Sequence, residues 1–271
     1  MRSKKKQTIW ANTIVQNEEN FIWFAIMSVV DYVDKILIWD TGSTDKTVDI
    51  IKELIKIKGK KISFKEVGEV DKYQFSKMRQ KMLDESKADW ILILDGDEIW
   101  WEKSIIRLKK EINLKADQVE GIVVPMVVPV GDMFHLQEEN AGKYKLLGKK
   151  GHLSLKAFSK NIPNLHVDNF YGREAFLDND NMPIQEREKI IFLNFPFLHV
   201  THLKRSGQKR KYEKFKYEVG RPVSKNFKFP EVFQKSFPKQ IPDPFRKITS
   251  ADLMKAKFLT PLRILKRRLY G

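Results

Sequence analysis

The sequence predicts an α/β fold in which a mostly parallel central sheet is flanked by helices, followed by a basic helical extension at the C-terminal end. Short apolar runs alternate with helical stretches over the first 101 residues. Polar clusters follow three of these runs, at the strand ends where open α/β sheets bind their ligands. From residue 203 onward, Lys and Arg greatly outnumber Asp and Glu, which predicts a basic tail.

The first part of the chain gives the clearest elements. Strands are expected at the apolar runs 8–15, 35–39, 62–66 and 90–94, of which the last is continuously apolar, as in strands buried on both faces. Helices are expected between and after them, at 18–30, 46–58 and 74–86. In the second helix Val48, Ile51, Leu54 and Ile55 fall on one side, and residues 42–45 supply its turn and N-cap.

The second part of the chain loses this alternation. Strands are expected at 121–130, 153–158 and 190–202, with loop-rich segments between them that would suit a substrate-specific lid. The basic tail predicts a helix over 204–219 and an amphipathic helix over 251–270. Between these two helices, residues 226–245 mix Pro, Phe and Lys without periodicity.

Composition narrows the chemistry. The chain has no cysteine, so disulfides and thiol catalysis are excluded and a metal would need oxygen or imidazole ligands, which favours Mg²⁺ or Mn²⁺. A formal net charge of +16 indicates an anionic partner: a nucleotide diphosphate, a nucleic acid or an anionic membrane. No apolar run approaches the ~20 residues of a spanning helix, and no signal-type segment follows the basic residues 1–6, so a cytoplasmic protein is expected.

An acidic cluster follows the fourth expected strand. Asp95 and Asp97 are separated by Gly96, so both carboxylates can face one divalent cation. Such a cation can bridge two phosphates and stabilise a leaving diphosphate. An acidic turn at a strand end is the plain alternative.

Four segments together resemble the nucleotide-binding signature of family 2 glycosyltransferases, which have the GT-A fold with its Rossmann-like sheet. They are 17–20 (Asn-Glu-Glu-Asn), 39–47 (Trp-Asp-Thr-Gly-Ser-Thr-Asp-Lys-Thr), Arg79 and 95–98 (Asp-Gly-Asp-Glu). The resemblance covers roughly residues 8–101, with weaker echoes to about 202. It implies a nucleoside-diphosphate sugar as donor, with a UDP-sugar favoured, and Mg²⁺ or Mn²⁺ as cofactor.

The resemblance also implies roles for single residues. Asp40 would accept a hydrogen bond from the nucleotide base, and Asn17 and Glu18 would line the base and ribose pocket, with helix capping as the alternative. Arg79 would meet the diphosphate, as suits a planar and permanently charged fork. Asp95 would contact the nucleotide sugar and, with Asp97, the metal. Gln80 departs from the Asn that many relatives carry next to this arginine.

An inverting reaction needs a carboxylate that takes the proton of the acceptor hydroxyl. Glu174 is our candidate, chosen over Asp168, Asp178, Asp180 and Glu186. Residues 155–158 and 171–176 are similar to a two-part pattern in the branch that adds sugars to lipopolysaccharide cores and related surface glycans. The match is partial, because Arg173 and Lys156 replace a His and an Arg of that pattern.

Two histidines close the strand expected at 190–202. Their spacing of three puts His199 and His202 on opposite faces of a continuous strand, so they would not share one metal. The resemblance implies a role for one of them, because relatives often carry a single His at the end of a late strand that can contact the metal or diphosphate. We assign this role to His202 because the basic residues 204 and 205 follow it, and a His satisfied by backbone hydrogen bonds is the alternative.

These assignments predict a catalytic domain over 1–203, with a nucleotide-sugar-binding half at 7–120 and an acceptor-binding half at 121–203, and a tail over 204–271. The acceptor is expected to be a glycan or a lipid-linked saccharide. The helix at 251–270 resembles one that lies on an anionic membrane at the inner face of the plasma membrane, or else packs its apolar stripe on the catalytic domain.

Other functions are less favoured. A nucleic-acid partner is disfavoured because no reader motif accompanies the charge. A sugar-phosphate nucleotidyltransferase would need a glycine-rich basic loop after the first strand, which residues 16–19 do not provide. A non-catalytic protein that binds anionic membranes or RNA is the third alternative.

Overall fold

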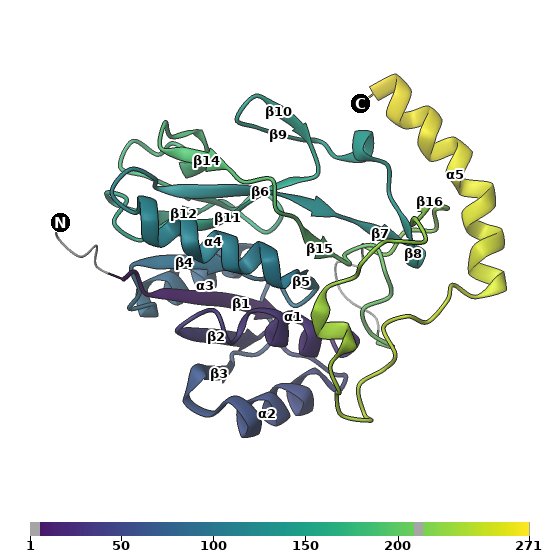
Figure 1. The fold of residues 1–271 in the computed structure, drawn as a ribbon, viewed down its shortest axis with the longest axis horizontal. Helices are drawn as coiled ribbons and strands as arrows, with labels where there is room; N and C mark the ends of the chain where they lie inside the picture. Colours follow the sequence, from purple (N-terminus) through teal and green to yellow (C-terminus); the bar gives the residue numbers. More distant parts are fainter. Residues whose placement is uncertain (1–5, 209–213, 271) are drawn as a thin grey trace.

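The computed structural model describes residues 6–208 and 214–270, and in this part of the chain a curled sheet runs through the molecule with helices on both faces (Figure 1). The α-helices are α1 (Ile22–Val29), α2 (Thr47–Lys58), α3 (Lys72–Glu85), α4 (Glu102–Lys115) and α5 (Ser250–Tyr270). The strands of the main sheet are β1 (Ile9–Val15), β2 (Lys35–Asp40), β3 (Ile62–Glu66), β4 (Trp90–Ile93), β5 (Glu98–Trp100), β6 (Gly121–Val127), β11 (Leu153–Ser159), β14 (Ile190–Phe192) and β15 (Phe197–His199).

The main sheet has the order β3-β2-β1-β4-β11-β6-β15-β5, and β14 also pairs with β6. The pairs β2–β3, β1–β2, β1–β4, β6–β14 and β6–β15 are parallel, whereas β4–β11, β6–β11 and β5–β15 are antiparallel. The α/β fold with a mostly parallel sheet and a C-terminal helix that the sequence predicts is therefore confirmed.

Smaller sheets surround the main one. Their strands are β7 (Pro129–Val130), β8 (Asp132–Leu136) and β16 (Arg221–Pro222) in one, β9 (Tyr144–Leu146) and β10 (Lys149–Gly151) in a second, and β12 (His166–Asp168) and β13 (Ala175–Leu177) in a third.

The alternation of β2 explains the layers. Ile36 and Ile38 pack into the large core cluster that also contains α1, α2 and α4, whereas Leu37 and Trp39 join a second cluster with Met78 of α3. Side chains on successive strand residues point to opposite faces, so a continuously apolar strand needs helices on both sides. The carboxyl ends of β1, β2 and β4 are left open, and the polar clusters follow them.

The structure differs from the sequence-based predictions at two places in the middle of the chain. Helix α4 was not expected, although Ile105, Leu108 and Ile112 form a buried stripe at helical spacing. The apolar run 190–202 is divided into β14 and β15, which both pair with β6. β14 pairs with residues 121–123 of β6 and β15 with residues 126 and 127, so the residues between β14 and β15 connect two strands that lie along the same edge of β6.

The helix expected over 204–219 is wrong for the described residues 204–208 and 214–219, which are irregular; residues 209–213 lie outside the described residues. The backbone makes its hydrogen bonds elsewhere. The amide of Asn20 donates to the carbonyl of Arg205 at 3.1 Å, and the amide of Lys216 donates to the carbonyl of His202 at 3.3 Å. Tertiary contacts thus replace the i to i−4 bonds of a helix.

The segment after residue 203 packs on the body of the molecule. The ring centroid of Phe24 in α1 lies 4.8 Å from that of Phe233 and 5.1 Å from that of Phe237. Ile241 is buried in the same core cluster. The aromatic residues of the non-periodic stretch 226–245 therefore cover α1, and the domain boundary at 203 stays a prediction.

Replacing Phe24 by Ala tests this packing. We expect the free energy of unfolding to fall by about 3–5 kcal/mol, because a fully buried aromatic ring is removed. Phe258→Ala is the control: its side chain is 75 % exposed, so its effect should stay within about 0.5 kcal/mol. Urea unfolding followed by circular dichroism gives both values. Equal effects of the two substitutions would contradict the packing of 226–245 on α1.

Candidate functional site

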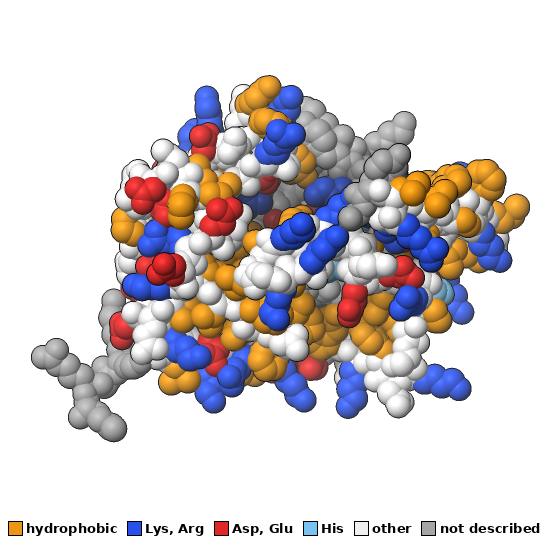
Figure 2. Space-filling model, turned by 90° about the horizontal axis from the view of Figure 1, so that it is seen from above, with side chains coloured by type: hydrophobic (Ala, Val, Ile, Leu, Met, Phe, Trp, Pro, Cys, Tyr) orange, Lys and Arg blue, Asp and Glu red, His pale blue; other side chains and the backbone are white. Residues whose placement is uncertain are grey.

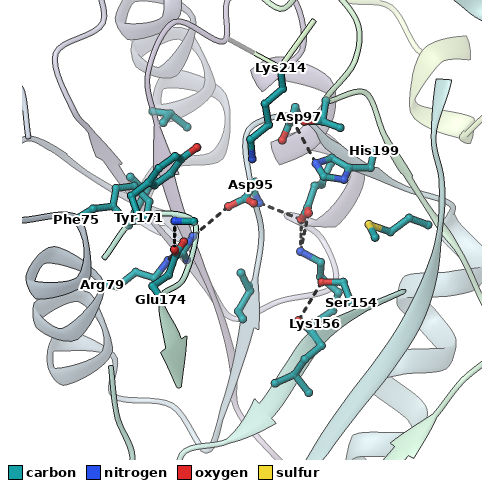
Figure 3. A pocket seen from close by; sticks show the side chains of 18 of the residues that line it. Phe75, Arg79, Asp95, Asp97, Ser154, Lys156, Tyr171, Glu174, His199 and Lys214 are labelled. Carbon is teal, nitrogen blue, oxygen red and sulfur yellow. Dashed lines mark hydrogen bonds and ion pairs between the residues drawn. The ribbon is translucent and has the colours of Figure 1, made fainter. Parts of the chain in front are cut away.

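A cavity of about 460 Å³ lies beyond the carboxyl ends of β1 and β4. Its size is within the range of small-molecule sites. The wall is built from the ends of β1 and β4, from α3, from β11 and from the loops before β13 and after β15 (Figure 3). Polar residues that line it include Gln16, Glu18, Thr41, Arg79, Asp95, Asp97, Glu98, Ser154, Lys156, Tyr171, Glu174, His199, Thr201, Arg205 and Lys214.

The cavity brings together five of the residues singled out from the sequence. Glu18, Arg79, Asp95, Asp97 and Glu174 all line it, although they come from four separate segments. The other three, Asn17, Asp40 and His202, are not among its lining residues.

Asn17 links the loop after β1 to the loop after β2, and Asp40 stabilises the turn of the loop after β2. Asn17 adopts a left-handed conformation with φ 53°, and its Oδ1 accepts a hydrogen bond from the amide of Thr44 at 2.7 Å. The carboxylate of Asp40 accepts hydrogen bonds from the amides of Gly42 and Ser43 at 3.0 and 2.9 Å. Both side chains therefore act in this structure as turn and capping residues, the alternative that the sequence left open.

Each carboxylate of the acidic cluster faces a positive charge from a distant segment. Arg79 Nη2 lies 3.6 Å from Asp95 Oδ1, and Arg205 Nη1 donates to Asp97 Oδ2 and, at 3.0 Å, to Glu18 Oε1. The remaining pair, Lys156 Nζ and Glu98 Oε1, lies at 2.6 Å with both side chains buried. Buried carboxylates require such partners because isolated charges are costly in a low-dielectric interior.

Gly96 sets the position of this cluster. A Cβ at this residue would lie 2.9 Å from Cγ of Glu18 and 3.0 Å from Cγ1 of Val15. The turn after β4 can therefore approach the end of β1 only because residue 96 lacks a side chain. This approach places Asp97 within reach of Arg205, which also holds Glu18.

The charges in the cavity affect each other. Burial acts to raise the pKa of Asp95, but Arg79 and Lys156 outweigh it and hold this pKa below its ordinary value. Burial acts to lower the pKa of Lys214, yet Tyr171 and Asp95 raise this pKa above its ordinary value. Figure 3 shows Lys214 extending towards Asp95. The cavity thus presents an anionic carboxylate between two cationic side chains at neutral pH.

The two histidines have different surroundings. His199 lines the cavity, and its Nε2 lies 3.5 Å from Asp97 Oδ2. His202 instead interacts through Nδ1 with the carbonyl of Lys214 at 3.0 Å, and burial lowers the pKa of His202 to about 3. The histidine beside the acidic cluster is therefore His199, and His202 has the backbone partner of the plainer alternative.

Asp97 and His199 can hold a divalent cation if a bound phosphate ligand supplies further oxygen atoms to it. Among residues 6–208 and 214–270, no three His, Asp or Glu side chains gather closely enough to form a metal cage. Asp97 and His199 provide one carboxylate and one imidazole ligand, whose Oδ2 and Nε2 atoms lie 3.5 Å apart. Mg²⁺ and Mn²⁺ are commonly held by one or two carboxylates together with substrate phosphates, so two protein ligands suffice.

Glu174 lies on the wall opposite His199 (Figure 3). Its loop is anchored on α3, since the amide of Tyr171 donates to the carbonyl of Lys72 at 2.8 Å. Glu174 Oε1 lies 4.0 Å from Arg79 Nε, and its Oε2 accepts a hydrogen bond from the amide of Gly172. The carboxylate is thus fixed beside the arginine that also faces Asp95.

Sequence reasoning singled out Arg79 but missed the other two partners of the acidic cluster, Lys156 and Arg205, and also Lys214. Lys156 was noted only as a departure from a pattern, yet a Lys within an apolar strand signals a buried charge that needs a partner. Arg205 lies in the stretch that we expected to be helical, and Lys214 carries no local signal. Their positions depend on the pairing of β11 with β4 and on the path of the chain after β15.

A mixed-charge cavity beyond the carboxyl ends of parallel strands defines the chain as a ligand-binding α/β protein. The family can be stated as well. The chain belongs to glycosyl transferase family 2, whose model matches residues 13–179. This stretch includes the four segments of the signature and Glu174, and it ends before His199 and Arg205.

Two relatives match part of this chain, and one of them is a glycosyltransferase. Glycosyltransferase SunS, from a prophage of Bacillus subtilis, is 29 % identical over 146 residues, which are 52 % of this chain and 32 % of SunS. A TPR repeat-containing protein of Synechococcus elongatus is 26 % identical over 175 residues, covering 65 % of this chain and 36 % of that protein. The chain therefore spans about a third of the length of these relatives.

A solved structure has a similar fold. It is S. aureus TarS in complex with UDP-GlcNAc, which matches with a TM-score of 0.51 and 11 % identity over 76 % of this chain and 60 % of the TarS chain.

The pair of Lys156 and Glu98 can be tested by substitution. Lys156→Met should lower the free energy of unfolding by about 3–5 kcal/mol at neutral pH, because it leaves a buried carboxylate without its partner. The loss should shrink as the pH falls and Glu98 becomes protonated, since burial already raises the pKa of this group. Urea unfolding at several pH values measures both effects.

The matched controls are Lys150→Met, at an exposed position, and the double variant Lys156→Met with Glu98→Gln. We expect the exposed change to be nearly neutral and the double variant to regain much of the stability. If the double variant is as unstable as the sum of the single variants, the pair does not stabilise the site.

Proposed function

We propose that the chain is a glycosyltransferase that moves a hexosyl group from a nucleoside-diphosphate sugar, with a UDP-sugar as the first candidate, to a glycan or lipid-linked acceptor, with inversion and assisted by Mn²⁺ or Mg²⁺. The observation that carries the proposal is one cavity in which Asp95 and Asp97 lie among Arg79, Arg205 and Lys214. Carboxylates can hold a cation, and the basic groups can hold a diphosphate.

Arg79 and Lys214 are the proposed diphosphate contacts. Both line the cavity, and Arg79 faces Asp95 at 3.6 Å rather than being fully neutralised by a closer pair. The guanidinium carbon Cζ also lies over the ring of Phe75, 5.2 Å from its centroid. A planar fork held in this way is suited to bidentate contact with phosphate oxygens.

Asp97 and His199 would hold the divalent cation, whose chemistry is to stabilise the charge of the leaving diphosphate. Arg205 now pairs with Asp97 and Glu18. Binding of a cation at Asp97 would therefore release Arg205 towards the phosphates. Compared with the metal ligands expected from the sequence, this assignment keeps Asp97, replaces His202 with His199 and leaves out Asp95, which faces Arg79.

Glu174 is the proposed base. In the reaction, the acceptor oxygen forms a bond to the anomeric carbon, and the bond between this carbon and the diphosphate oxygen breaks with its electron pair on the diphosphate. The proton of the acceptor hydroxyl passes to the Glu174 carboxylate. The carboxylate lines the cavity and is held by the amide of Gly172, so it has a fixed position for this transfer.

Donor and cation binding can be measured together. Titration calorimetry with UDP-, GDP- and dTDP-sugars in Mn²⁺ should identify one donor class that binds the wild type. Asp97→Asn should weaken this binding at least tenfold, about 1.4 kcal/mol, and Asp117→Asn, at an exposed position, should not. In EDTA the wild type and Asp97→Asn should bind weakly and alike. Equal affinities of these two proteins in Mn²⁺ would remove Asp97 from the cation site.

Glu174→Gln separates binding from chemistry. It should keep the donor affinity of the wild type, while the rate of nucleoside diphosphate release with water as acceptor falls by about 10²- to 10⁴-fold, because the proton acceptor is lost. Glu188→Gln, at an exposed position, is the control and should leave the rate unchanged. A rate near that of the wild type in Glu174→Gln would move the base to another carboxylate.

A further inference from the structure

Helix α5 is attached to the body of the protein along one face. Ala256 is fully buried, and the Oγ1 of Thr260 accepts a hydrogen bond from the amide of Val219 at 2.8 Å. About two turns further on, Arg267 pairs with the buried carboxylate of Glu218. These positions recur at helical spacing, so the orientation of the helix about its own axis is fixed.

The opposite face of α5 is apolar and exposed. At about 100° per residue, the five side chains of this face fall within an arc of about 80°, centred opposite the attached face. They are Met254, Phe258, Leu262, Leu265 and Leu269, with exposed fractions of 72 %, 75 %, 56 %, 54 % and 65 %. We call this set the α5 stripe. The alternative in which the helix packs its apolar stripe on the catalytic domain is therefore not the arrangement of this structure.

Exposed basic side chains flank the α5 stripe on both sides. Lys255 and Lys266 lie along one edge at this helical spacing, and Lys257 and Arg268 lie along the other. The whole helix has six basic residues against one acidic residue, Asp252. Figure 2 shows apolar side chains along the helix at the right edge of the molecule, with Lys and Arg beside them.

We propose that α5 binds the surface of a membrane that contains anionic lipids. Its stripe would enter the interface between headgroups and acyl chains, and the flanking Lys and Arg would contact lipid phosphates. None of the helices in the described ranges is long and apolar enough to cross a bilayer, so α5 would lie in the plane of the surface. A second copy of the chain fits the stripe less well, because two such basic helices repel each other.

Vesicle sedimentation tests this proposal independently of the transferase reaction. The full chain is mixed with vesicles of phosphatidylcholine alone or with phosphatidylglycerol. We expect binding to the phosphatidylglycerol vesicles that weakens as salt is raised. The double variant Phe258→Glu and Leu262→Glu should lose this binding by at least about tenfold, with an unchanged melting temperature because both side chains are exposed.

The matched control is Ile57→Glu with Leu114→Glu. It removes two large apolar side chains that are also exposed, at 55 % and 49 %, and adds the same charge far from α5 in the sequence. This variant should bind like the wild type. Equal loss in both double variants, or no preference of the wild type for anionic vesicles, would overturn the proposal. So would a wild-type dimer in sedimentation equilibrium that the Phe258→Glu, Leu262→Glu variant lacks.

Discussion

The need to neutralise buried carboxylates at the end of β4 organises the site. Three carboxylates occur within four residues, and two of them, Asp97 and Glu98, are buried, where an unpaired charge would be costly at the low dielectric of the interior. Arg79, Lys156 and Arg205 meet this need from α3, from β11 and from the chain after β15. The acidic cluster therefore ties together α3, β11 and the chain after β15, which form walls of the cavity, and its most distant partner, Arg205, lies 108 residues from Asp97 in the sequence.

The same constraint links the proposed catalytic groups. Arg79 faces both Asp95 and Glu174, so the proposed base and the proposed diphosphate contact share one cation. Gly96 allows the acidic cluster to approach the end of β1, and this approach lets Arg205 reach Asp97 and Glu18 together. Substitutions at two of these positions are thus expected to have non-additive effects on stability, because the residues share one ion-pair network.

The sequence predicted local features well and long-range partners poorly. The strands that became β1 to β4 and helices α2, α3 and α5 have strong periodicity, and their bounds were close to those observed. Glu18, Arg79, Asp95, Asp97 and Glu174, which all line the cavity, were singled out because strand ends and a family resemblance mark them. Two outcomes depended on tertiary structure. The described residues 204–208 and 214–219 make hydrogen bonds with other segments and form no helix, and after the break that follows β14 it is His199, not His202, that lies beside Asp97.

Charge balance also explains why the proposed donor and cation would bind together. A diphosphate alone would gain Arg79 and Lys214 but would lie close to Asp95 and Asp97. A divalent cation alone would have to displace Arg205 from Asp97 without a new partner for the arginine. If both were bound, Asp97 would hold the cation in place of Arg205, and the released Arg205 would pair with the diphosphate. Each ligand would thus remove the electrostatic cost of the other, which would be positive coupling between two binding events in one cavity.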